Sequence, residues 1–350
     1  MESGYRPVLL PLLKSARRVV VTCHVDPDGD AVAGLLALSH SLRKLSRWDV
    51  HAISPGQVPA SYHFMPNWES VEVYSPERLE TLQGMATKDA VLSADVIVCL
   101  DSSDLHRLGA LYVQNRTKFE SVPIVNIDHH PSNSRFGTVN LVDGSAAAVC
   151  EQLAELMERE DLPIPEEVAT DLLVGIVTDT LGFRTPATSA RTLRTAATLM
   201  ERGASLSLIS ERVFNTRSPR TLWLWGRVLS RTRVEDGLVW ADITSDMLAE
   251  CGATLEDADT LVDFIAGVPR TNAAFLFSEQ RGKVRVSMRT SAELDAAALA
   301  KSFGGGGHAR AAGCTLEGSI ADVQALLLGE ARRRLGMVAN GGERYQESGS

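Results

Sequence analysis

The stretch His24-Val25-Asp26-Pro27-Asp28-Gly29-Asp30 places one imidazole and three carboxylates within seven residues. It follows the apolar run Val19-Val20-Val21 and precedes the alanine-rich apolar segment 31–38, an order that predicts a strand, a tight turn and a helix. Charges of this density after a buried strand repel one another unless a cation neutralises them. Imidazole with carboxylates suits Mn²⁺, Zn²⁺, Co²⁺ or Fe²⁺ better than Ca²⁺. The alternative is a solvated Asp/Pro/Gly turn that caps a helix. The rest of the chain is needed to choose between a cation site and such a turn.

Two further predicted strands end in the same kinds of side chain. Residues 95–100 read DVIVCL and are followed at once by Asp101, and residues 121–127 read SVPIVNI and are followed by Asp128-His129-His130. Strands and helices joined by connections of this length predict an open, mainly parallel sheet, in which ligands bind at the carboxyl ends of the strands. Taken singly, an Asp after a strand is often a helix cap and a His pair is often structural.

The combined set is large enough for two metal ions. Two neighbouring ions need a bridging carboxylate, and Asp101 is the natural candidate for it. Two-metal sites stabilise the attacking and leaving oxygens of a phosphoryl displacement. The candidate residues are His24, Asp28, Asp30, Asp101, His129, His130 and, after a predicted helix, Asp179.

The apolar patterning predicts two domains that differ in the order and type of their helices and strands. Helices are predicted at 7–18, 31–44, 145–159 (starting at Asp143-Gly144-Ser145), 166–176 and 188–202, and strands at 18–23, 49–54, 95–100 and 121–127. After a linker at 205–220, strands of an antiparallel sheet are predicted at 227–234, 238–243, 273–278 and 283–289, and helices at 255–265, 295–303 and 320–335. The predicted domains are 1–204 and 221–338, and the Gly/Ser/Glu-rich tail 339–350 is predicted to be disordered.

A second constellation lies in the C-terminal half, at Gly304-Gly305-Gly306-Gly307-His308. Four consecutive glycines are unsuited to a helix or an ordinary strand, and they predict a backbone N–H cradle for an anion. His308 and Arg310 would add donors, whereas the alternative is a flexible linker. Alternation along residues 284–289 (VRVSMR) puts Arg285, Ser287 and Arg289 on one face, either a solvated face or a phosphate-reading one.

Composition limits the classes of partner. The net charge of the 350 residues is −9 and the pI is about 5.5, which argues against coating of long nucleic acid but leaves room for a small nucleotide in a local basic pocket. Five scattered cysteines without CxxC spacing fit reduced thiols in a cytoplasm. No secretory pattern is evident and no apolar run approaches the ~20 residues of a membrane helix. The chain is predicted to be soluble and cytoplasmic, without a membrane partner.

These motifs together resemble the DHH phosphoesterase superfamily. The seven-residue turn, Asp101, Asp128-His129-His130 and Asp179 are similar to its four motifs, and the GGGGH segment is similar to the substrate motif of the associated DHHA1 domain. The resemblance extends from about residue 15 to 335, and the length is similar to that of the short oligoribonuclease and 3′-phosphoadenosine-5′-phosphate (pAp) phosphatase group. It implies an α/β fold with an N-terminal, mainly parallel-sheet DHH domain, a smaller C-terminal α+β DHHA1 domain, and the active site in the cleft between them.

The resemblance also implies a role for each matching residue. Two Mn²⁺ are implied, with Co²⁺ or Mg²⁺ as substitutes, and Asp101 would bridge them. His130 would face the substrate phosphate and Asp128 would orient an imidazole, so both are the implied catalytic residues. One metal ion would be held by His24, Asp28 and Asp101, the other by Asp30, Asp101, His129 and Asp179, and the substrate by Gly305, Gly306, Gly307, His308, Arg310 and Arg289.

The implied reaction is hydrolysis of short oligoribonucleotides of the 5′-pNpN type, of pAp, or of both, to mononucleotides; some actinobacterial relatives also cleave cyclic di-AMP. A homodimer is implied, with short RNA or a nucleotide as the partner.

A manganese-dependent inorganic pyrophosphatase uses a similar metal set, but the glycine segment favours a nucleotide. A processive single-strand exonuclease would need more chain and a basic channel. A catalytically inactive nucleotide sensor predicts a missing ligand, and none is missing.

Overall fold

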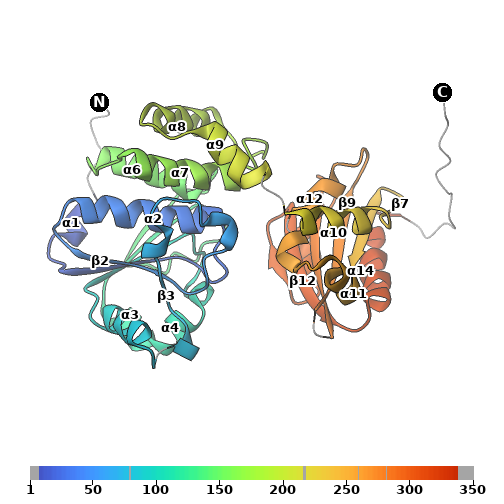
Figure 1. The fold of residues 1–350 in the computed structure, drawn as a ribbon, viewed down its shortest axis with the longest axis horizontal. Coiled ribbons are helices and arrows are strands. Elements are labelled where there is room, and N and C mark those ends of the chain that lie inside the picture. The colour runs from blue at the N-terminus through green and yellow to red at the C-terminus, as the bar shows by residue number, and fades with distance from the viewer. Residues whose placement is uncertain (1–7, 79, 216–217, 259, 281, 338–350) are drawn as a thin grey trace. The chain divides into compact units, whose positions relative to one another are not determined.

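The computed structural model describes residues 8–78, 80–215, 218–258, 260–280 and 282–337, and the chain divides into two compact units, residues 1–216 and 217–350 (Figure 1). The tail 339–350, predicted to be disordered, lies outside the described residues.

The described residues of the first unit form a six-stranded sheet in which every neighbouring pair is parallel. The strand order is β3-β2-β1-β4-β5-β6, and the mainly parallel sheet predicted from the sequence is confirmed. The edge strands β3 and β6 were not predicted, because β3 has two residues and Asn140 interrupts the apolar run of β6. The strands are β1 (Arg18–Thr22), β2 (Asp49–Ser54), β3 (Glu72–Val73), β4 (Val96–Leu100), β5 (Ile124–Asp128) and β6 (Val139–Val142).

Helices cover both faces of this sheet, as a parallel sheet requires. Val19 and Val21 of β1 face the cluster formed with α2, α6 and α7, whereas Val20 faces the cluster under α3, α4 and α5 (Figure 1). The helices of the first unit are α1 (Leu9–Leu13), α2 (Gly29–Lys44), α3 (Leu82–Leu92), α4 (Ala110–Gln114), α5 (Arg116–Ser121), α6 (Val149–Arg159), α7 (Glu166–Asp179), α8 (Ala190–Glu201) and α9 (Leu206–Ser210). Short turns of 3-10 helix lie at Ala60–Tyr62, Trp68–Ser70, Pro76–Arg78 and Leu105–Leu108, and a π-helical turn lies at Glu211–Asn215.

Several predicted boundaries are wrong for local reasons. Helix α6 begins at Val149 rather than near 145, because the Asp143 carboxylate accepts from the backbone N–H of Ser145 and closes a separate turn. Helix α7 runs on to Asp179, so that carboxylate lies in its last turn. The predicted linker 205–220 contains α9 and the first residues of α10 (Pro219–Leu229).

The described residues of the second unit form another six-stranded sheet, in the order β11-β12-β10-β9-β8-β7. It is antiparallel except for the β8–β9 pair, which is parallel because α11 and α12 form a crossover between the two strands. The purely antiparallel prediction is therefore corrected. The strands are β7 (Arg233–Glu235), β8 (Leu238–Ile243), β9 (Ala273–Gln280), β10 (Lys283–Thr290), β11 (Gly306–Gly307) and β12 (Ala311–Glu317).

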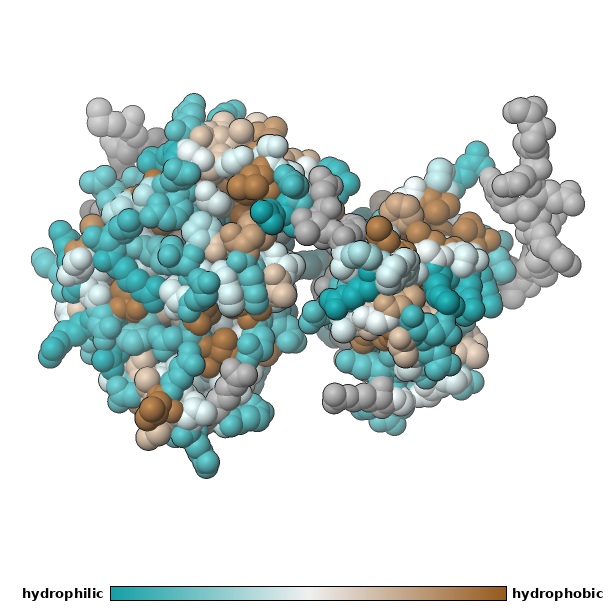
Figure 2. All heavy atoms as spheres, in the orientation of Figure 1, coloured by the Kyte–Doolittle hydropathy of each residue, from teal (hydrophilic) through white to brown (hydrophobic). Residues whose placement is uncertain are grey.

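The predicted strand at 227–234 is also wrong in its first half, which belongs to helix α10. Ser218 caps that helix through the Thr221 N–H, Pro219 opens it, and Leu224 and Val228 form its buried stripe. Figure 2 shows hydrophobic residues gathered near α10 and α12, where Leu222 and Phe264 are exposed. The helices are α10, α11 (Ser245–Cys251), α12 (Leu261–Ala266), α13 (Ala296–Lys301) and α14 (Ile320–Arg334), with a 3-10 turn at Leu255–Ala258.

No helix within the described ranges is long and apolar enough to cross a bilayer.

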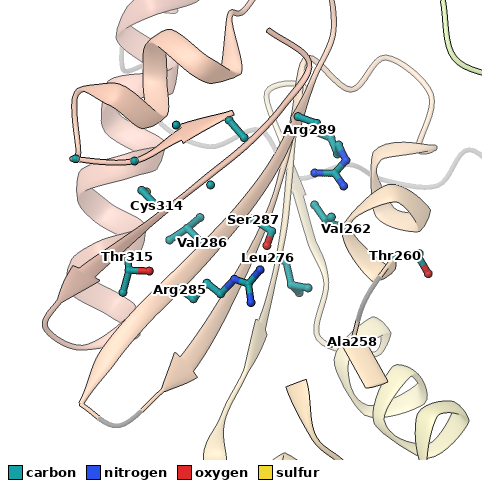
Figure 3. Close-up of a pocket in the computed structure, with 16 residues that line it drawn as sticks. Ala258, Thr260, Val262, Leu276, Arg285, Val286, Ser287, Arg289, Cys314 and Thr315 are labelled. Carbon is teal, nitrogen blue, oxygen red and sulfur yellow. The ribbon is translucent and has the colours of Figure 1, made fainter. Parts of the chain in front are cut away.

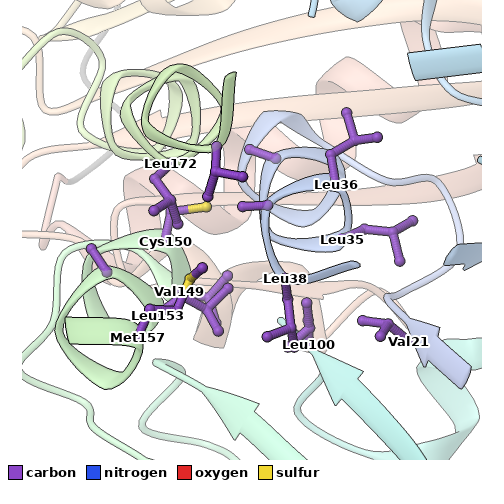
Figure 4. Close-up of a cluster of buried hydrophobic side chains, with 14 of the residues drawn as sticks. Val21, Leu35, Leu36, Leu38, Leu100, Val149, Cys150, Leu153, Met157 and Leu172 are labelled. Atoms are coloured by element: carbon purple, nitrogen blue, oxygen red, sulfur yellow. The ribbon is translucent and has the colours of Figure 1, made fainter. Parts of the chain in front are cut away.

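The core of the first unit lies where α2 packs between the sheet and helices α6 and α7. Leu35, Leu38, Leu100 and Leu172 are fully buried there (Figure 4). Because α2 carries Asp28 and Asp30 at its start, this packing also fixes the position of the two carboxylates.

We expect Leu172→Ala to lower the free energy of unfolding of the first unit by about 2–5 kcal/mol, because it leaves a cavity against α2. The matched control is Leu82→Ala, since Leu82 is 89% exposed and its loss should change that free energy by less than about 0.5 kcal/mol. Urea unfolding followed by circular dichroism measures both, and equal effects of the two variants would contradict this assignment of the core.

Candidate functional site

The three strands that precede the predicted ligands are neighbours in the sheet. β1 pairs with β4 and β4 pairs with β5, so their carboxyl ends meet at one edge. Asp28 and Asp30 join them as the N-cap and the first turn of α2, and Asp179 joins from the last turn of α7. The structure thereby brings together all eight residues predicted for the metal and catalytic roles in the first unit: His24, Asp28, Asp30, Asp101, Asp128, His129, His130 and Asp179.

Asp101 lies at the centre of this cluster. Its φ of +52° is rare for a residue other than glycine, and its N–H donates to the carbonyl of Ile127 at 3.0 Å, which fixes the turn after β4. The side chain is only 2% exposed. One carboxylate oxygen, Oδ2, lies 3.4 Å from His24 Nε2, and Oδ1 lies 3.4 Å from His129 Nε2. Oδ1 is buried without a hydrogen-bond partner among the described residues, which fits an oxygen that a cation would coordinate.

His24, Asp28 and Asp101 form one group of candidate ligands, whose ligand atoms lie within 4.8 Å of one another. His24 Nδ1 is 2.7 Å from the carbonyl oxygen of Val25, which can only accept, so Nδ1 carries the proton. The lone pair of the neutral ring is then on Nε2, 3.8 Å from Asp28 Oδ1 and 3.4 Å from Asp101. A carbonyl that accepts from the other ring nitrogen in this way commonly orients a histidine that binds a metal ion.

Asp30, His129 and Asp179 form a second group within the same distance limit. Asp30 is 1% exposed, and both of its carboxylate oxygens accept backbone hydrogen bonds from the first turn of α6, Oδ2 from Val149 at 2.5 Å and Oδ1 from Cys150 at 3.0 Å. The N-terminal amides of a helix favour a negative charge there. His129 Nε2 lies 3.5 Å from Asp179 Oδ2, which completes the group.

Asp128 holds His130 in place. Its carboxylate is fully buried, and Oδ1 accepts from His130 Nδ1 at 2.7 Å and from the His129 N–H at 2.9 Å. The other oxygen accepts from Asn133 Nδ2 at 2.6 Å, and the same amide donates to the Ser102 carbonyl at 3.1 Å. Asn133 was missed by the sequence reasoning; its only signal was a polar residue three positions beyond the two histidines.

Burial and mutual contact shift the pKa values of the clustered side chains. Burial opposes a charged imidazole, but the adjacent Asp101 carboxylate outweighs it and raises the pKa of His24 and of His129 to about 10. Burial raises the pKa of Asp30 to about 7, and the negative charge of Asp101 adds to this. Burial also raises the pKa of Asp179. Divalent cations would replace these protons and allow every carboxylate to ionise, so the residues present fit a metal centre.

Three of the six predicted substrate residues of the second unit line a groove of about 610 Å³, which Figure 3 shows on the open face of the sheet. Gly305, Gly306 and Arg289 line it, together with Arg285 and Ser287. Gly307, His308 and Arg310 are not among the lining residues. Instead, the Arg310 guanidinium donates to the carbonyls of Ser291 and Leu294.

Part of the glycine segment, which was predicted to be unsuited to an ordinary strand, does form one. Gly306 and Gly307 form the short strand β11, paired with Gly313 and Ala312 of β12. A Cβ at Gly305 would lie 2.2 Å from the Gly313 carbonyl oxygen, and Gly307 has a φ of +142°. Glycine is therefore needed at these positions for close packing against β12.

Comparison with known proteins gives a consistent match over both units. Residues 18–176 match the family model described as DHH family, N-terminal domain, and residues 244–335 match the DHHA1 domain. The chain is 33% identical over 302 residues to the bifunctional oligoribonuclease and PAP phosphatase NrnA of Thermus thermophilus, covering 86% of this chain and 84% of the relative. The protein of the same name from Bacillus subtilis is 26% identical over 85% of this chain and 89% of its own length.

A solved structure shows the same fold. The exopolyphosphatase-related protein from Bacteroides fragilis superposes with a TM-score of 0.84 and 24% identity, over 93% of this chain and 96% of that one.

Gly175 of α7 gives a direct test of how Asp30 is positioned. A Cβ there would lie 2.6 Å from Asp30 Oδ1 and 2.3 Å from Cys150 Sγ, so Gly175→Ala must displace the carboxylate or part the helices. We expect the variant to bind divalent cations at least about tenfold more weakly, as measured by isothermal titration calorimetry. Gly329→Ala in α14 is the control, because its Cβ would meet nothing within 4 Å. Unchanged cation affinity in Gly175→Ala would rule out Asp30 as a ligand held by this packing.

Proposed function

The chain belongs to the DHH family and is a hydrolase of phosphoester bonds, and on that premise we propose that it cleaves short oligoribonucleotides and pAp to mononucleotides with two Mn²⁺ ions. The observation that carries the proposal is the buried Asp101 carboxylate, with an imidazole 3.4 Å from each of its oxygens and a further carboxylate group on either side.

The two groups of candidate ligands share Asp101 in the proposed assignment. His24, Asp28 and Asp101 would hold one ion, and Asp30, His129 and Asp179 together with Asp101 would hold the other. Imidazole and carboxylate donors suit Mn²⁺, and Co²⁺ and Mg²⁺ are its substitutes in this proposal. When bound, two such ions lower the pKa of a water and neutralise charge on the phosphate oxygens.

The protein's own contribution to the reaction is the placement of His130. Asp128 Oδ1 accepts a hydrogen bond from His130 Nδ1–H, which leaves Nε2 facing the substrate. A ring protonated on both nitrogens would donate from Nε2–H to a phosphate oxygen or give that proton to the leaving oxygen. Asn133 holds the second oxygen of Asp128 and thereby fixes the carboxylate that orients the ring. The buried position of Asp128 keeps competing water away from this contact.

The DHHA1 domain and the names of the relatives support a nucleotide substrate over inorganic pyrophosphate. The groove in the second unit supports this as well, because it offers arginines beside a surface of small residues. Cyclic di-AMP, whose two phosphodiester bonds belong to the same bond class, is a further candidate substrate. We also propose that the protein works in the cytoplasm as a homodimer. That the active site lies between the two domains stays a prediction.

The substrate is tested by supplying Mn²⁺ and four compounds side by side to the purified protein: pAp, the dinucleotide pApA, a five-nucleotide RNA and cyclic di-AMP. We expect release of AMP from pAp and pApA and shortening of the RNA, all abolished by EDTA, because the carboxylate cluster cannot act without cations. Pyrophosphate in a fifth reaction is the control. Hydrolysis of pyrophosphate alone would contradict the proposal.

His130→Ala should lower kcat on pAp by about 10²–10⁴-fold while both metal ions stay bound, because the ring acts on the substrate rather than on the metal in this assignment. Turnover and metal content by mass spectrometry give the two readouts. His63→Ala is the matched control, since that ring stacks on Trp68 at 3.6 Å and is not among the clustered ligand residues. Normal turnover in His130→Ala would refute the role.

A further inference from the structure

The sheet of the second unit has one partly uncovered face. Helices α13 and α14 cover the side that buries Val286 and Met288, whereas α10, α11 and α12 cover the opposite side mainly over β8 and β9. On that opposite side, β10 presents Arg285, Ser287 and Arg289 in alternation, and all three line the groove (Figure 3).

The surface of the groove suits an anionic, flat ligand. None of the described residues that line it is acidic. Ser287 and Thr315 bring hydroxyl groups, and Gly313, the strand partner of Ser287, adds no side chain to the surface. A ligand with phosphate groups and planar bases has the matching chemistry.

The two arginines of the groove differ in their pairing. Arg289 donates to both oxygens of Asp263, at 2.6 and 3.2 Å, so its charge is already compensated. Arg285 is exposed, and within the described residues it makes neither a hydrogen bond nor an ion pair. A guanidinium in this state is free to form a charge-assisted bond with a phosphate at no cost of breaking another.

Arg285 and the glycine segment line the same groove, but Arg285 lies further along the sheet. β11 pairs with β12 at Gly306 and Gly313, and Gly313 lies opposite Ser287, whereas Arg285 lies opposite Thr315. Arg285 and Arg289 are four positions apart on β10, which is about 13 Å along the strand. Stacked nucleotides advance about 3.4 Å each, so this length corresponds to several nucleotides rather than one.

We propose that Arg285 binds a backbone phosphate of an RNA strand lying along this groove, and that it makes the protein favour oligoribonucleotides over pAp. The inference rests on the proposed function, since it names a residue that sets its substrate length. The glycine end of the groove serves a single nucleotide, and Arg285 contributes only when further nucleotides follow.

Lys283 supplies a matched control on the same strand. It lies two residues from Arg285 and so shares its face, but it does not line the groove, and its ammonium lies 3.5 Å from Glu317. Lys283→Gln therefore removes the same charge as Arg285→Gln from almost the same place without touching the groove.

The test compares wild type, Arg285→Gln and Lys283→Gln on pAp and on a five-nucleotide RNA with Mn²⁺. We expect Arg285→Gln to raise KM for the RNA about tenfold with kcat unchanged, and to leave pAp kinetics within about twofold. Lys283→Gln should match wild type on both substrates. An equal loss on pAp and RNA in Arg285→Gln, or equal behaviour of the two variants, overturns the inference.

A binding measurement separates this inference from the proposed function. Fluorescence anisotropy of the labelled RNA in EDTA, at several salt concentrations, should show a slope of log affinity against log salt that is smaller by about 0.7 in Arg285→Gln only, as expected for one lost phosphate contact. RNA binding that depends on Arg285 without hydrolysis of any substrate would refute the function and keep the inference. Hydrolysis of both substrates without dependence on Arg285, or absence of RNA binding by the wild-type protein, refutes the inference.

Discussion

Carboxylates and imidazoles converge on the side chain of Asp101. The residue is 2% exposed, so water cannot solvate its charge. Burial raises the pKa of Asp30 to about 7, whereas the two imidazoles hold the pKa of Asp101 below its usual range. The fold supports this arrangement at three points: the adjacent ends of β1, β4 and β5, the amides that begin α6, and Gly175, which lets α7 approach Asp30. Added positive charge would stabilise these carboxylates in their ionised form, and in this way the fold fits a metal-dependent hydrolase.

The parts predicted from the sequence were those with a local signal. Apolar runs such as 96–100 gave β4 almost to the residue, and the polar residues that follow such runs marked one edge of a parallel sheet. The eight clustered residues could be named in advance because each lies within three residues of the start or the end of a predicted element. Helix α10 was not predicted, although Ser218 and Pro219 mark its start, because residues up to 220 were assigned to a linker and residues 227–234 to a strand.

The parts not predicted depend on contacts between segments far apart in the chain. Asn133 acquires its role only because the loop after β5 returns to Asp128. Arg289 is paired with Asp263, 26 residues away, so its charge is compensated where Arg285 remains free. The glycine segment forms β11 because β12 packs against it, which no composition rule indicates. Strand pairing and ion pairing of this kind are tertiary in origin.

The central claim is that Asp101 lies between two cations in the working protein. The most direct measurement is anomalous diffraction from crystals of the protein grown with Mn²⁺. We expect two anomalous peaks, one beside each carboxylate oxygen of Asp101, with His24 at one peak and His129 at the other. A single peak that Asp101 does not contact, or peaks bound by residues outside the two groups of candidate ligands, would contradict it.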